Sequence, residues 1–148
     1  MSKADLVRTL CTELLADRQH LHAINAILSA QRQAILTYAQ ADLDQLNQQL
    51  MQHYRQLHQH ARQRMAGLQQ LGLPAAPQGM TQLLAQLPEA ARHPLQSAWQ
   101  EITEQLQQCQ QTNHHNRQLI EMQYDILQNS LPVSGEGPSW LYQPGQHA

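Results

Sequence analysis

The fold is set first by residues 6–38, which read LVRTLCTELLADRQHLHAINAILSAQRQAILTY. Apolar residues recur there every seven positions, and further apolar residues fall between them. This spacing places them along one face of an α-helix, as in the seam of a coiled coil. The segment therefore predicts a long helix with one buried face. The members of that face are Val7, Leu10, Leu14, Leu21, Ile24, Leu28 and Ile35.

The apolar pattern changes phase after Tyr38. Continuing the same seam would place Asp42, Gln45 and Gln49 in it, whereas the apolar residues that follow sit at other positions. We therefore predict a first helix over 3–39 and a second helix over 42–71, with Asp42 and Gln45 as the capping pair of the second. The apolar positions of the second helix are Leu43, Leu46, Leu50, Tyr54, Leu57, Ala61 and Leu68.

Proline and glycine punctuate the chain in two places. Between residues 72 and 94 they leave room for one short helix over 81–87, capped by Thr81. A third long helix is predicted over 94–131, and Pro132 ends it. The tail, residues 132–148, contains three glycines and two more prolines, which predicts irregular structure. The expected fold is all-α: an elongated antiparallel bundle of three long helices over residues 1–131, with a short helix in the middle connection.

Composition agrees with a helical protein and excludes several functional classes. The chain has 148 residues, enough for one domain with a core, no Phe, and few β-branched residues from which to build strands. The net charge is −2 and the arginines are spread along the chain, which argues against nucleic-acid binding. Neither a signal peptide nor an apolar run of 18 residues is present, so we expect a cytoplasmic protein without membrane insertion. Cys11 and Cys109 are then expected to be free thiols.

Two asparagines stand in the expected seam of the third helix. One heptad line runs through Trp99, Leu106 and Asn113, and the other through Leu95, Ile102, Cys109, Asn116 and Gln123. A buried asparagine in a helical seam typically fixes register or the choice of partner. Alternatively, the seam faces the surface here and the pair has no such role.

The end of the third helix carries more apolar residues than one seam can bury. Ile120 and Leu127 fit the seam, but Leu119, Met122 and Ile126 point about a quarter-turn away. Each of them left in water forgoes about 1.5–3 kcal/mol of burial. Either another helix covers this second stripe as plain core, or a partner does. The predicted partner-binding residues are Asn113, Asn116, Leu119, Ile120, Met122, Tyr124, Ile126 and Leu127.

No constellation of residues predicts catalysis, a cofactor or a metal site. The histidine pairs 20/22 and 58/60 are two apart and point to different sides of a helix, whereas helical metal sites need a spacing of three or four. We expect these histidines to be solvated, and charged pairs such as Glu101 and Glu104 to be surface charges. The tail, however, holds Trp140, Leu141 and Tyr142 together, which is typical of a short docking motif; alternatively, these residues fold back onto the bundle.

The third helix also carries a family resemblance. The run from Leu106 to Gln123, LQQCQQTNHHNRQLIEMQ, resembles the signature helix of the FlgN family of flagellar export chaperones, with its Asn-x-x-Asn-x-x-Leu-Leu/Ile pattern. The coarse pattern covers the whole chain, but only about 20 residues and the Leu-Tyr of the tail are specific to the family. Two positions depart from it: Arg117 follows the second Asn, where relatives often have Gly, and Gln143 replaces the Gly after Tyr142.

The resemblance implies a function and its partners. Such proteins bind flagellar hook-associated subunits, the proteins of the hook–filament junction, in the cytoplasm and deliver them to the type III export apparatus. It implies that the C-terminal amphipathic helix holds helical segments of the subunit, and that Tyr142, with Trp140 and Leu141, contacts the export gate. The alternative from another class is a coiled-coil adaptor that self-associates through the same stripe, so a homodimer stays open.

Overall fold

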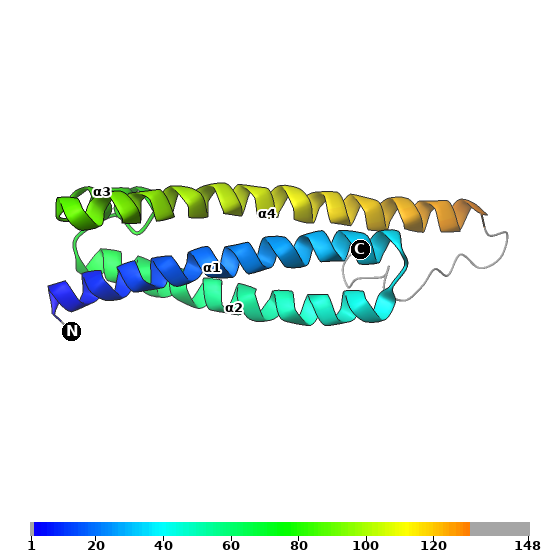
Figure 1. The fold of residues 1–148 in the computed structure, drawn as a ribbon, viewed down its shortest axis with the longest axis horizontal. Coiled ribbons are helices and arrows are strands. Elements are labelled where there is room, and N and C mark those ends of the chain that lie inside the picture. The colour runs from blue at the N-terminus through cyan, green and yellow to red at the C-terminus, as the bar shows by residue number, and fades with distance from the viewer. Residues whose placement is uncertain (1, 131–148) are drawn as a thin grey trace.

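The computed structural model describes residues 2–130, and these form four helices (Figure 1). They are α1 (Lys3–Leu36), α2 (Gln40–Gln70), α3 (Pro77–Ala85) and α4 (Glu89–Ser130). No strand occurs within the described residues. The prediction of an all-α fold with three long helices and a short one in the middle connection is confirmed. The tail predicted over 132–148 lies outside the described residues.

Helix α1 lies at the centre of the bundle. Figure 1 shows α2 on one side of it and α4 on the other, with α2 running in the opposite direction to both. Because α1 packs against two helices, its heptad seam is the most completely buried part of the chain. Helix α3 packs against α4 at the end of the bundle opposite the α1–α2 turn. The main core consists of Leu10, Leu14, Leu21, Ile24, Ile27, Leu28, Leu50, Leu68, Met80, Leu83, Leu84, Ile102 and Cys109.

The turn between α1 and α2 is built around Tyr38, which adopts a positive φ of 56°. The backbone N–H of Ala39 donates to the carbonyl of Ala34 at 2.9 Å, and that of Tyr38 to Ile35 at 3.3 Å. This pair of bonds is the Schellman motif, whose left-handed position usually holds glycine. The end of α2 repeats the motif with Gly72 at φ 74°. The α1–α2 turn thus has the same geometry as the end of α2, but it has Tyr38 at the position where glycine would make the turn recognisable in the sequence.

The predicted capping role of Asp42 is wrong. Helix α2 begins at Gln40, its N-cap is Ala39, and no side chain caps it. The Schellman motif already fixes the chain direction, so α2 can start directly after the turn. Asp42 lies in the first turn instead, where a carboxylate still interacts favourably with the helix dipole.

Replacing Tyr38 tests the strain in this turn. A non-glycine residue in the left-handed region costs about 1–2 kcal/mol, whereas glycine adopts it freely. We expect Tyr38→Gly to be more stable than Tyr38→Ala by about 1 kcal/mol, because both variants lose the same side-chain contacts and only glycine relieves the backbone. Urea unfolding of the two variants measures this difference, and equal midpoints would show that the turn is unstrained.

Other predicted boundaries also differ from the structure: α1 ends at Leu36 rather than at residue 39, and α3 ends at Ala85 rather than at residue 87. Helix α3 begins at Pro77 rather than at Thr81, and the Thr81 hydroxyl donates to the Pro77 carbonyl at 3.3 Å from inside the helix. Proline suits a first helical position because its missing N–H needs no partner there. Helix α4 begins at Glu89 rather than near residue 94, with Pro94 inside it. So close to the start, Pro94 removes only the bond to the carbonyl of Ala90.

Candidate partner-binding site

The buried face of α4 runs through one of the two predicted heptad lines. Ile102, Cys109, Asn116 and Gln123 are buried against α1, whereas Asn113 in the other line is exposed. The interpretation that both asparagines replace core residues is therefore right for Asn116 and wrong for Asn113. The reason is tertiary: α4 packs mainly against α1, so one line suffices to make most of the contact.

Two amides fix the register of α4 on α1. Nδ2 of Asn116 donates to the backbone carbonyl of Leu28 at 2.9 Å, and Nε2 of Gln123 donates to that of Ile35 at 2.9 Å. Both donors and both acceptors are seven residues apart, so the two bonds repeat after two turns of each helix. Sliding α4 along α1 would break both bonds. Gln123 was not among the predicted site residues, although its heptad spacing from Asn116 is the signal that could have found it.

A third polar contact continues this line toward the N-terminus of α4. Sγ of Cys109 donates to Oδ1 of Asn25 at 3.1 Å, and the amide of Asn25 donates to the side chain of Gln105. Burial raises the pKa of the Cys109 thiol to about 11, which keeps it protonated and unreactive near neutral pH. Cys109 and Cys11 are both free thiols, as predicted, although Cys11 is only half-buried.

The predicted apolar stripe is partly open. Leu119 and Ile120 are half-buried and pack against a small core cluster around Ile35 and Leu43. Met122 and Ile126 are 52% and 57% exposed. The remaining two predicted residues, Tyr124 and Leu127, are half-buried. We name the set at positions i, i+3 and i+7 the α4 apolar face; it consists of Leu119, Met122 and Ile126.

The α4 apolar face lies where the bundle ends. Gln123 bonds to Ile35, the second-last residue of α1, so residues 124–130 continue past the end of α1. Figure 1 shows these last turns of α4, in orange, projecting beyond the α1–α2 turn. Within residues 2–130, the end of α4 therefore keeps Met122 and Ile126 more than half exposed, while Tyr124 and Leu127 are half-buried.

Several histidines are paired, which corrects the expectation that they are solvated. Nδ1 of His20 lies 2.9 Å from Nδ1 of His53, and Nε2 of His22 lies 2.7 Å from Oε1 of Glu101. Burial and then the neighbouring His53 lower the pKa of His20. Among residues 2–130, no three His, Cys, Asp or Glu side chains are arranged to hold a metal ion.

A buried carboxylate anchors the same α1–α2 interface. Asp17 is 3% exposed and contacts His60, with 2.5 Å between Oδ1 and Nδ1, and also Arg64. Arg64 in turn lies over the Trp99 ring of α4, 5.7 Å from its centroid. Nearby, burial raises the pKa of Glu13, an effect that His60 and Arg64 partly oppose. This cluster ties all three long helices together.

Comparison with known proteins connects this geometry to a family. A protein-family model described as FlgN protein matches residues 1–147. The chain belongs to the FlgN family. Members of the FlgN family are flagellar export chaperones for hook-associated proteins, and they are not enzymes. The chain is accordingly a chaperone of this type, and its helical fold fits a binding function.

Two further comparisons were made. Searches of the curated proteins and of the solved structures found no match. Within residues 2–130, no helix has an apolar stretch long enough to cross a membrane. Trp140, Leu141 and Tyr142, predicted from the FlgN resemblance to contact the export gate, lie outside the described residues.

Proposed function

We propose that the chaperone holds its hook-associated client through the α4 apolar face, in the cytoplasm. The observation that supports this proposal is the exposure of Met122 and Ile126 on a helix end that the bundle does not cover. A client segment that folds as an amphipathic helix could lay its own apolar face there. Asn113 is also exposed, but it lies nine residues, or two and a half turns, before Met122 and therefore on the opposite side of α4. Ile120, Tyr124 and Leu127 are half-buried and lie at other angles around the helix, so this contact does not require them.

The amides of α4 support this proposal in a second way. Asn116 and Gln123 attach α4 by directed hydrogen bonds at positions where leucine would attach it by apolar packing. Directed bonds hold one rotation of the helix, so they keep Met122 and Ile126 turned away from α1. The two features therefore work together. Asn116 and Gln123 fix the rotation of α4, and the α4 apolar face is left for the client.

Replacing Ile126 with Asp tests this face. We expect Ile126→Asp to weaken binding to a hook-associated subunit by at least about tenfold, because a charge would have to be buried in the contact. Stability should change little, since Ile126 is 57% exposed in the free protein. Isothermal titration of purified chaperone with the subunit measures the affinity. Leu15→Asp is the matched control, because Leu15 is 41% exposed on α1, far from the α4 apolar face along the bundle. Equal affinity of Ile126→Asp and wild type would remove the assignment.

The delivery step requires a second contact. We propose that Trp140, Leu141 and Tyr142 address the export gate, as the FlgN resemblance implies. Deleting residues 132–148 should then leave subunit affinity unchanged and reduce secretion of the subunit into the culture medium. The control is Tyr142→Phe, which keeps the ring and should export more than the deletion. Loss of subunit binding in the deletion would show that the two contacts are not separate.

A further inference from the structure

The middle of the chain has an unbalanced charge. No Asp or Glu occurs between Asp44 and Glu89, whereas this stretch contains three arginines and three histidines. Arg64 is paired with Asp17, as described above. Within residues 2–130, neither Arg55 nor Arg62 forms an ion pair. Within the described part of the chain, helix α2 thus presents two guanidinium groups without an acidic partner, seven residues apart.

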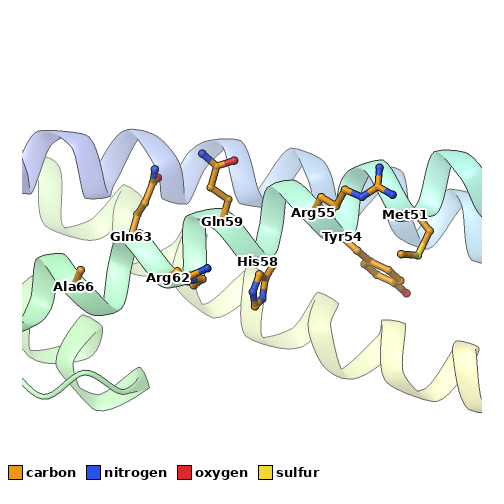
Figure 2. Close-up of a pocket in the computed structure, with 8 residues that line it drawn as sticks. All are labelled: Met51, Tyr54, Arg55, His58, Gln59, Arg62, Gln63 and Ala66. Atoms are coloured by element: carbon orange, nitrogen blue, oxygen red, sulfur yellow. The ribbon is translucent and has the colours of Figure 1, made fainter.

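These two arginines line a hollow along α2. The hollow measures about 610 Å³, and its lining runs from Met51 to Ala66. Figure 2 shows two diverging rows: Gln59 and Gln63 point to one side, and Tyr54 and His58 point to the side along which α4 runs. Among residues 2–130, the residues that line it are Met51, Tyr54, Arg55, His58, Gln59, Arg62, Gln63 and Ala66, all from α2.

The same face of α2 carries apolar residues at helical spacing. Met51 at one end of the hollow is 48% exposed, and Met65 beside the other end is 50% exposed. With His58 midway between them, they repeat every seven residues, as a seam against another helix does. This outer seam is separate from the inner line of α2 through Leu50 and Leu57, which belongs to the core. Helix α2 therefore carries two half-exposed methionines outside the side that α1 covers.

We propose that the outer face of α2 docks an acidic amphipathic helix of a partner protein. Residues 51–66 extend over about 23 Å, or four helical turns, which suits a helix lying along the hollow. Apolar residues of that helix would contact Met51 and Met65, while its Asp or Glu side chains would pair with Arg55 and Arg62. The chain's own α2 acids, Asp42 and Asp44, lie near its start, outside the lining of the hollow. Charge complementarity thus disfavours a symmetric contact between the α2 helices of two copies of this chain.

This site is independent of the α4 apolar face. It lies on another helix, and the charge that distinguishes it is absent from Leu119, Met122 and Ile126. A chaperone with both faces could hold its client on α4 while α2 engages an acidic helix of another component. Failure of one assignment therefore leaves the other standing.

Two designed peptides test the proposal on the full chain. Each is a fluorescently labelled helix former of about 18 residues, long enough to span the hollow. They share one leucine face, which is flanked by Glu in the first and by Lys in the second. Fluorescence anisotropy should show that the Glu peptide binds and that the Lys peptide binds at least about tenfold more weakly. The double variant Arg55→Glu, Arg62→Glu should reverse this preference.

Matched variants separate the site from general charge and from the α4 apolar face. Arg8→Glu, Arg32→Glu makes the same change in net charge at exposed positions of α1 and should keep wild-type affinity for the Glu peptide. Ile126→Asp should also keep it. The proposal is overturned if the double variant on α2 binds the Glu peptide as wild type does, or if a peptide with alanine in place of leucine binds equally well. It is also overturned if sedimentation shows a dimer that the same α2 variant dissociates, because the hollow would then serve self-association.

Discussion

Asp17→Ala is expected to destabilise the protein by about 3 kcal/mol, more than any change at its surface charges. Asp17 is 3% exposed and is the counter-charge of Arg64, whose side chain is 13% exposed. Removing one member of a buried ion pair leaves the other charge buried and unpaired, which typically costs 3–5 kcal/mol. Arg64 also lies over Trp99, so it cannot turn into water without giving up a contact with α4. Thermal unfolding should show a midpoint lower by roughly 10 °C.

The chain offers a matched control for this experiment. Asp5 and Arg8 form an ion pair with 3.7 Å between Oδ1 and Nη1, but both side chains are more than half exposed. Exposed pairs of this kind contribute about 0–1 kcal/mol, so Asp5→Ala should be nearly neutral. The double variant Asp17→Leu, Arg64→Met should recover most of the lost stability, because it leaves no buried charge unpaired. If Asp17→Ala behaved like Asp5→Ala, the cluster would not hold the helices together.

The parts of the fold that could be predicted are those in which local pattern and tertiary contact agree. The α1 seam was readable because α1 lies between two helices, so its heptad residues are buried throughout. The α1–α2 turn was misplaced because Tyr38 occupies the position that glycine marks at the end of α2. The start of α4 was misplaced because a proline near a helix N-terminus is compatible with the helix, which the sequence alone does not reveal.

The sequence predicts which residues form the candidate site, but not which side of α4 faces α1. The excess of apolar residues after Asn116 is visible in the sequence, and Met122 and Ile126 are indeed exposed. Two heptad lines compete on α4, however, and only the position of α1 decides between Asn113 and Asn116. The α2 hollow was missed for a similar reason. Its arginines are separated by glutamines in the sequence. Only the structure shows that they lie on a side of α2 that α1 does not cover.

Gly79→Ala is expected to be the most damaging single-methyl change in the chain. A Cβ at this buried position would lie 1.9 Å from the carbonyl oxygen of Pro74, a distance at which the backbone itself must move. We expect a loss of about 3 kcal/mol or more, at the upper end of the range for overpacked cores. The free energy of unfolding in urea measures it. The displaced backbone leads directly into α3, whose Met80 and Leu84 are fully buried in the main core.

Gly67→Ala separates this clash from the general effect of adding a methyl group. Its Cβ would meet only the ends of the Leu6 and Leu10 side chains, at 3.2 Å, and these can shift by a few tenths of an ångström. Alanine also favours the helix over glycine by about 1 kcal/mol, so the net change should be close to zero. A loss at Gly79 without one at Gly67 would show that the connection before α4 needs close backbone approach. Helix α3 packs against the start of α4, so Gly79→Ala should also loosen the start of α4. The α4 apolar face lies at the other end of that helix. Equal stability of the two variants would mean that the connection before α4 yields without cost.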